Sequence, residues 1–171
     1  MTDEKRTGPT EFIIPELPKN TVILYREYEK INRAEEASKL QYLSLSAGCR
    51  FFVAGDIPLA RSLNAEGVHI PHWLLETVKQ DDLLGLKTTV ACHDQQALHR
   101  AEELKLTMAL VSPVFPTSSH PGAPVLGIDM LTNLSANAKI ELAALGGITK
   151  DTAPLLKNLS LSAIAGVSAF V

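Results

Sequence analysis

The sequence has 171 residues, of which 46% are hydrophobic and 20% are charged, and its formal net charge is −3. A chain of this length and composition can bury one ordinary hydrophobic core, so we expect a single domain. The weak net charge and the lack of any lysine or arginine block give no sign of nucleic-acid binding, and no apolar run is long enough to cross a membrane.

Strand-like and helix-like segments alternate along the whole chain. We expect strands over residues 21–25, 50–54, 67–70, 86–91, 107–111, 140–144 and 162–165. We expect helices over residues 32–47, 58–63, 73–78, 94–104, 129–136 and 150–159. Residues 12–14 are ambiguous, because they fit either a short strand or the end of a helix broken by Pro15 and Pro18.

The predicted strands are apolar throughout and do not alternate with a period of two. This pattern is typical of a parallel sheet that is covered on both faces. The spacing of the repeats fits either a doubly wound sheet or a (β/α)₈ barrel. No GxGxxG motif opens any of the predicted helices, which counts against a dinucleotide-binding fold.

The N-terminus and the two cysteines also bear on the class of protein. Residues 1–10 (MTDEKRTGPT) have no apolar core, so they do not form a signal peptide. We expect a disordered tail over residues 1–10, a single domain over residues 11–171 and a cytoplasmic location. Cys49 and Cys92 are not spaced like metal ligands, so we expect buried thiols.

The most distinctive stretch is residues 112–127, SPVFPTSSHPGAPVLG, which follows an apolar strand. Its four prolines fix the backbone, so the polar side chains between them have little conformational freedom to lose. These side chains are Thr117, Ser118, Ser119 and His120. A stiff, hydroxyl-rich loop at the end of a strand suits an anionic group, although a proline-rich surface connection gives the same pattern.

This loop, together with the later LGGIT and GVSA segments at 145–149 and 166–169, resembles the thiamine-phosphate synthase family, which includes the thiazole tautomerases. The resemblance implies an α/β fold of the TIM (β/α)₈ barrel type and a role in thiamine biosynthesis. Such a barrel usually needs about 200–250 residues. We therefore expect a barrel that is incomplete at both ends, without its first strand and helix and its last helix. A homo-oligomer is one assembly that would cover the exposed strand edges.

The resemblance also implies where the phosphate of the thiazole substrate binds. The matching positions are Thr117, Ser118, Ser119, Gly146, Gly147, Val167 and Ser168. All of them follow predicted strands, and in barrels the loops at the carboxyl ends of the last strands often hold phosphate. The alternatives are an ordinary tight turn at the glycine pair and an ordinary helix cap at Ser168.

The pyrophosphate half of the family's site is altered in this sequence. The family's QLREK-like run corresponds to residues 24–28, LYREY, in which Arg26 is retained. The resemblance implies a magnesium ion, but the two ligand positions are Gly55 and Leu74, with only Asp56 nearby as a shifted ligand. We therefore name Arg26 and His120 as candidate catalytic residues that neutralise phosphate charge.

Three further histidines and one tryptophan are weaker candidates. His69, His72 and His93 are general acids if they face the pocket, and otherwise ordinary strand-end or helix-cap residues. Trp73 could stack on a flat heterocycle, although a buried anchor is the ordinary interpretation.

Three functions remain open from the sequence. The first is a transferase that joins hydroxymethylpyrimidine pyrophosphate to thiazole phosphate and releases pyrophosphate. The second is a non-catalytic paralogue that binds a small phosphorylated heterocycle. The third is a thiazole tautomerase, which in this family uses a histidine where this chain has Pro113.

Overall fold

The computed structural model describes residues 1–117, 122 and 124–168. Within these ranges seven strands form one sheet, in which every neighbouring pair is parallel and the spatial order follows the chain. The strands are β1 (Val22–Tyr25), β2 (Arg50–Ala54), β3 (Gly67–Ile70), β4 (Lys87–Cys92), β5 (Met108–Val111), β6 (Glu141–Leu145) and β7 (Ala163–Ala165). All seven predicted strands are therefore confirmed.

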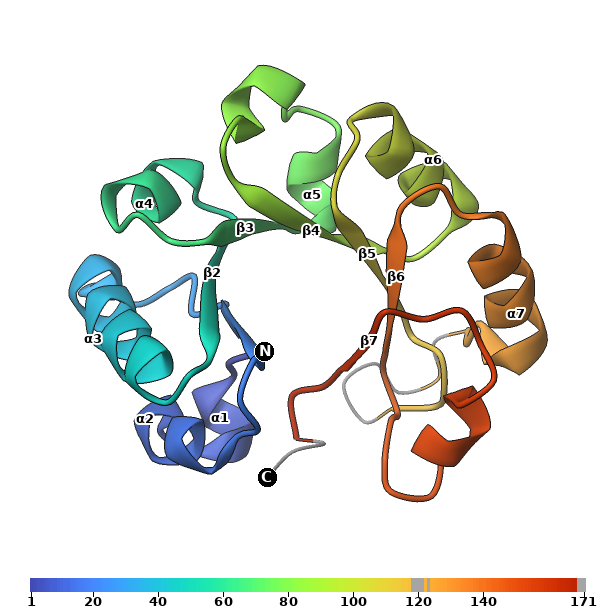
Figure 1. Ribbon diagram of the computed structural model, residues 1–171, viewed down its shortest axis with the longest axis horizontal. Helices are drawn as coiled ribbons and strands as arrows, with labels where there is room; N and C mark the ends of the chain where they lie inside the picture. Colours follow the sequence, from blue (N-terminus) through green and yellow to red (C-terminus); the bar gives the residue numbers. More distant parts are fainter. Residues whose placement is uncertain (118–121, 123, 169–171) are drawn as a thin grey trace.

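The helices lie on the outer side of the curled sheet (Figure 1). They are α1 (Glu4–Thr7), α2 (Thr10–Ile13), α3 (Arg33–Ser46), α4 (Ile57–Ser62), α5 (His72–Leu75), α6 (Gln95–Glu103) and α7 (Gly127–Asn137). Three short 3₁₀ turns cover Ile14–Glu16, Gln80–Leu83 and Ala153–Leu156. Asp56 and Asp94 cap α4 and α6 by accepting a backbone N–H bond three residues ahead. No helix in these ranges is long and apolar enough to cross a membrane.

The sheet curls like a barrel but does not close. β1 and β7 are its two edges, and the opening between them lies next to α1 and α2 (Figure 1). The expected TIM-like fold is confirmed as a half-barrel of seven strands.

The helix expected over residues 150–159 is shorter than predicted. Only the 3₁₀ turn at Ala153–Leu156 forms there. A helix that began at Lys150 would need the amide of residue 154 to donate to the carbonyl of residue 150, and Pro154 has no N–H. The turn before it is instead closed by Thr152, whose hydroxyl donates to the Gly147 carbonyl at 3.0 Å.

The structure differs from the disorder expected for residues 1–10. Thr2 is 5% exposed and makes hydrogen bonds along the open edge of β1. Its N–H donates to the Leu24 carbonyl at 2.9 Å, and its hydroxyl accepts from the Arg26 N–H at 2.8 Å. Lys30 pairs with Glu4 at 2.6 Å. Asp3 and Glu4 thus have partners more than 20 positions away, which the polar sequence of this segment does not reveal. Residues 12–14 are helical rather than extended.

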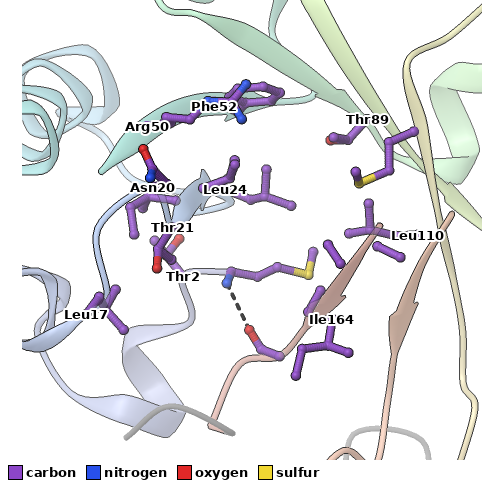
Figure 2. A pocket seen from close by; sticks show the side chains of 18 of the residues that line it. Thr2, Leu17, Asn20, Thr21, Leu24, Arg50, Phe52, Thr89, Leu110 and Ile164 are labelled. Carbon is purple, nitrogen blue, oxygen red and sulfur yellow. Dashed lines mark hydrogen bonds between the residues drawn. The ribbon is translucent and has the colours of Figure 1, made fainter. Parts of the chain in front are cut away.

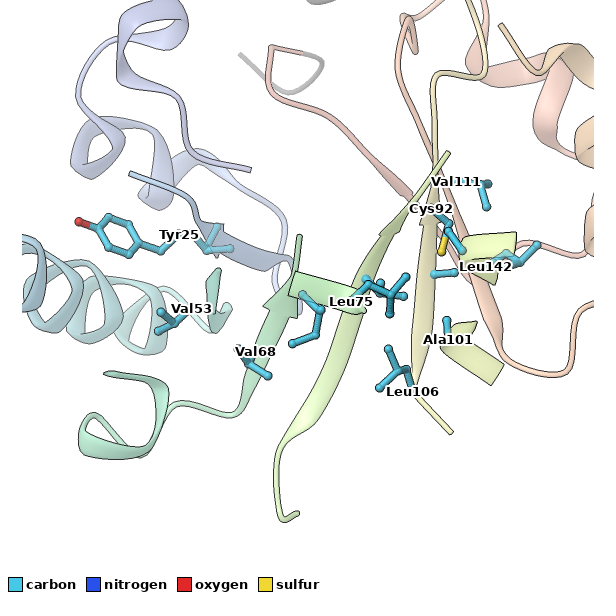
Figure 3. Close-up of a cluster of buried hydrophobic side chains, with 14 of the residues drawn as sticks. Tyr25, Val53, Val68, Leu75, Cys92, Ala101, Leu106, Val111 and Leu142 are labelled. Carbon is cyan, nitrogen blue, oxygen red and sulfur yellow. The ribbon is translucent and has the colours of Figure 1, made fainter. Parts of the chain in front are cut away.

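The core lies on both sides of the sheet. The larger cluster packs between the strands and the helices, and Figure 3 shows Tyr25, Val53, Val68, Leu75 and Leu142 within it. A smaller cluster lies on the inner face of the curl and consists of Leu24, Phe52, Leu110 and Ala143. Because side chains alternate across a strand, neighbouring residues of one strand serve the two clusters, and every strand needs an apolar sequence.

Both cysteines are free and buried, as predicted. Burial raises the pKa of the Cys92 thiol to about 12 and also raises that of Cys49. Neither side chain carries thiolate at neutral pH, so both serve as small core residues.

Candidate active site at the carboxyl ends of the strands

The predicted site residues that the structure describes all follow a strand at the same end of the sheet. Arg26 follows β1, Thr117 follows β5, Gly146 and Gly147 follow β6, and Ser168 follows β7. Parallel strands bring these segments to one rim, which is the working face of α/β barrels. Ser118, Ser119 and His120 lie outside the described residues.

The loop after β5 and the glycine pair after β6 form one packed unit. The Val114 N–H donates to the Leu145 carbonyl at 2.9 Å, and the Phe115 N–H donates to the Gly146 carbonyl at 3.1 Å. Gly147 has a φ of +66°, and a Cβ there would lie 2.5 Å from the Pro116 carbonyl oxygen. Glycine is therefore required at this position for both backbone conformation and space. These contacts fix the loop on the turn as far as Pro116, the residue before Thr117.

β7 completes this part of the rim. It lies beside β6, with Leu145 paired to Ala165. Val167 is half-buried and Ser168 is exposed to solvent. The structure thus brings three predicted stretches, at Thr117, at the glycine pair and at Ser168, to the ends of three consecutive strands.

Arg26 lies at the far side of the opening, and the N-terminal segment engages it. Its guanidinium pairs with the Asp3 carboxylate at 3.1 Å, and its side chain is 33% exposed. A phosphate group would have to share this cation with Asp3 or displace it. The guanidinium has five N–H donors, so the pair with one carboxylate oxygen leaves others available.

Arg33, which the sequence analysis missed, organises the segment after β2. Its guanidinium donates to the Asp56 carboxylate at 2.7 Å, to the Ala54 carbonyl at 2.6 Å and to the Glu27 carbonyl at 3.0 Å. The other oxygen of Asp56 accepts the Leu59 N–H at 2.9 Å. Both oxygens of Asp56 are thus engaged, so the shifted metal ligand considered from the sequence has no oxygen without a partner.

The implied magnesium ion does not fit the residues present. Gly55 and Leu74 offer no side-chain oxygen, whereas magnesium requires oxygen ligands. The space beside Gly55 is taken by aromatic side chains, because a Cβ there would lie 3.0 Å from Tyr28 and 3.2 Å from Trp73. Among the described residues, no group of three or more histidine, cysteine, aspartate or glutamate side chains is placed to hold a metal ion.

The three histidine candidates differ in their environment. His69 is 2% exposed, and its Nδ1 lies 2.9 Å from the Thr89 hydroxyl. Burial lowers the pKa of His69 to about 3, so this side chain is neutral at pH 7 and is not a general acid. His72 and His93 are exposed on the rim, with ring centres 5.5 Å apart.

Trp73 is not the buried anchor that would be its ordinary role. It is 63% exposed and makes an edge contact with Tyr28, with ring centres 6.4 Å apart. Its exposed ring remains a candidate surface for stacking.

A cavity inside the curl of the sheet does not coincide with the predicted phosphate site. It has a volume of about 560 Å³ and is lined by residues of both edge strands (Figure 2). Leu24, Phe52, Leu110 and Ile164 supply apolar walls, and Val167 is the one predicted site residue in its lining among those described. Its lining also includes Arg50, Lys87 and Glu141, the first residues of β2, β4 and β6, so the cavity extends toward the amino ends of the strands and does not locate the phosphate site.

Comparisons with known proteins agree with this architecture. A family model described as thiamine monophosphate synthase matches residues 16–170. The thiamine-phosphate synthase of Lactococcus lactis subsp. cremoris (strain SK11) is 32% identical over 158 residues, which cover 85% of this chain and 67% of the relative. That of Azoarcus sp. (strain BH72) is 31% identical over 169 residues, which cover 92% of this chain and 78% of the relative.

A solved structure gives the same result. Thiamine phosphate pyrophosphorylase from Pyrococcus furiosus superimposes with a TM-score of 0.83 at 25% sequence identity. The match covers 98% of this chain and 83% of that protein. Family homology thus supports a function in thiamine biosynthesis, and the chain belongs to the thiamine monophosphate synthase family.

Proposed function

We propose that the protein is a cytoplasmic thiamine-phosphate synthase-type transferase, which joins hydroxymethylpyrimidine pyrophosphate to thiazole phosphate and releases pyrophosphate. One observation carries the proposal. The loop after β5 packs on the Gly146–Gly147 turn at the rim of a chain that the family model matches over residues 16–170. Both segments belong to the motif through which the sequence resembles the family.

Thiazole phosphate binds in this proposal at the ends of β5, β6 and β7. Its phosphate accepts hydrogen bonds from hydroxyl and backbone N–H groups of a rigid turn, which pays little entropy on binding. The residues in this role are Thr117, Ser118, Ser119, Gly146, Gly147, Val167 and Ser168. Hydrogen bonds to an ionised phosphate are about twice as strong as neutral ones.

The reaction separates charge and therefore needs an electrostatic partner for the leaving group. The bond between the pyrimidine methylene carbon and the pyrophosphate oxygen breaks, and its electron pair leaves with pyrophosphate. The lone pair of the thiazole nitrogen then forms the new carbon–nitrogen bond. In our proposal Arg26 and His120 stabilise the charge that develops on pyrophosphate, and Arg26 exchanges its Asp3 partner for the departing anion.

A second function is favoured by a separate observation. Gly55 and Leu74 occupy the positions at which the resemblance implies magnesium ligands, and Asp56 is engaged by Arg33. A protein that had lost only the pyrophosphate half of its site would still bind a phosphate ester without turning it over. This non-catalytic binder is the alternative to the transferase.

Equilibrium binding of each half-substrate separates the two functions. Isothermal titration calorimetry should show that the transferase binds both thiazole phosphate and hydroxymethylpyrimidine pyrophosphate, whereas the binder takes only the monophosphate. Ser168→Asp should abolish thiazole phosphate binding, because it places a negative charge beside the phosphate. Ser160→Asp adds the same charge at the opposite end of β7 and should leave binding unchanged. Equal binding by both variants would remove the proposed phosphate site.

A further inference from the structure

Two histidines meet on the rim at the ends of β3 and β4. His72 opens α5 two residues after β3 ends, and His93 directly follows β4. The two strands are neighbours in the sheet, with Ile70 paired to Val90. The ring centres lie 5.5 Å apart, the rings are inclined by 59°, and both side chains are exposed.

A hydrogen bond fixes which nitrogen of His93 is available to a ligand. Nδ1 of His93 lies 2.9 Å from the Ser112 carbonyl oxygen, which can only accept a hydrogen bond. Nδ1 therefore carries the proton, and the lone pair is on Nε2. A backbone carbonyl that holds the second ring nitrogen is the usual support of a metal-binding histidine.

The ring of His72 makes no hydrogen bond within the part of the chain that the structure describes. No hydrogen bond from these residues therefore engages a ring nitrogen of His72, and its ring lies beside that of His93. With zinc–nitrogen bonds of about 2.0–2.1 Å and tetrahedral angles, two liganding imidazoles have ring centres about 5.2 Å apart. The distance of 5.5 Å in this structure is close to that value.

We propose that His72 and His93 together bind a borderline divalent cation, with Zn²⁺ as the test case, through one ring nitrogen each. Imidazole favours zinc, cobalt, nickel and copper over magnesium, which prefers oxygen ligands. No third protein ligand stands near the pair among the described residues. The remaining coordination positions are therefore open to water or to oxygens of a phosphate group.

The open positions connect this metal site to the proposed function, on which this step rests. Gly55 and Leu74 offer no side-chain oxygen on this rim, whereas His72 lies on the same helix as Leu74 and His93 follows the next strand. A cation held by the pair would bring positive charge to this side of the rim, where a diphosphate could complete its coordination. Inorganic pyrophosphate should therefore tighten zinc binding.

Calorimetric titration with ZnCl₂ tests the site directly, with tag-free protein at pH 7.5 in a buffer that does not bind metals. The wild type should bind one Zn²⁺ per chain, and MgCl₂ should give no heat. His72→Ala and His93→Gln should each weaken zinc binding by roughly tenfold or more. His99→Ala is the matched control, because this exposed histidine on α6 lies next to Glu103 and outside the His72–His93 pair.

The outcomes are distinct from those of the proposed reaction, because zinc is titrated without substrate. Zinc affinity that is unchanged in both His72→Ala and His93→Gln would overturn the metal site, as would an equal loss in His99→Ala. Zinc binding without formation of thiamine phosphate would leave the metal site standing and refute the transferase. Zinc affinity that does not change when pyrophosphate is added would refute only the proposed link between the zinc site and the transferase reaction.

Discussion

Replacement of Gly147 by alanine tests whether the turn after β6 and the loop after β5 form one unit. Gly147 has a φ of +66°. A Cβ added at this residue would lie only 2.5 Å from the Pro116 carbonyl oxygen. Alanine at such a backbone angle costs about 1–2 kcal/mol, of which about 0.4–1 kcal/mol is offset by the lower entropy of the unfolded chain. The steric conflict adds about 1–3 kcal/mol.

Gly85→Ala is the matched control for the backbone part of this cost. Gly85 has a φ of +80°, and nothing lies within 4 Å of the position its Cβ would take. We expect Gly85→Ala to lower the free energy of unfolding by about 0.5–1 kcal/mol and Gly147→Ala by about 2–4 kcal/mol. Urea denaturation at pH 7 measures both, and the difference between the variants isolates the contact with Pro116.

The same substitution should act on the ligand site. The added methyl group pushes the loop after β5 away from β6, so thiazole phosphate should bind about tenfold or more weakly to Gly147→Ala, with Gly85→Ala unchanged. Equal losses of stability in the two variants would mean that the loop gives way freely. The glycine pair would then have no role in positioning Thr117.

Three further predictions concern stability, and each follows from one side chain. Thr10 is 5% exposed and its hydroxyl has no hydrogen-bond partner among the described residues, so Thr10→Val should raise the free energy of unfolding by about 1 kcal/mol in urea denaturation; a loss would show that the hydroxyl is satisfied. Burial lowers the pKa of His69 in the folded protein to about 3. Below about pH 6.5 the unfolded chain therefore binds one more proton at this residue than the folded chain does. Stability should therefore fall by about 2 kcal/mol between pH 7 and pH 5 from this group, and His69→Asn but not His99→Gln should flatten that slope. Arg33→Met should cost about 2–3 kcal/mol because it leaves half-buried acceptors unpaired, whereas Arg100→Met breaks a surface pair worth about 0–1 kcal/mol; equal losses would contradict this account.

The strands and most of the helices could be predicted because their signals are local. A parallel sheet buried on both faces needs continuous apolar segments, and residues 50–54 (RFFVA) and 108–111 (MALV) show this directly. Caps such as Asp94 mark the start of a helix within a few residues. Pro154 was an equally local signal, and its missing N–H explains why the helix predicted from residue 150 is reduced to a turn.

The parts that could not be predicted depend on partners distant in sequence. The N-terminal residues look like a solvated tail, but the Thr2 N–H donates to the Leu24 carbonyl of β1 and Asp3 pairs with Arg26. Arg33 has no motif of its own, and its role appears only when β2 brings Asp56 beside it. The predicted phosphate residues could be placed at strand ends from the sequence, whereas the packing of Pro116 on Gly147 required the fold.

Direct turnover tests the central claim most closely. The protein is mixed with hydroxymethylpyrimidine pyrophosphate and thiazole phosphate, with and without added divalent cation, and thiamine phosphate is followed by chromatography. The account predicts product from the wild type and from Ser160→Asp, and little or none from Ser168→Asp or Thr117→Ala. The absence of product from folded wild-type protein under every metal condition would contradict the transferase and leave the phosphate-ester binder.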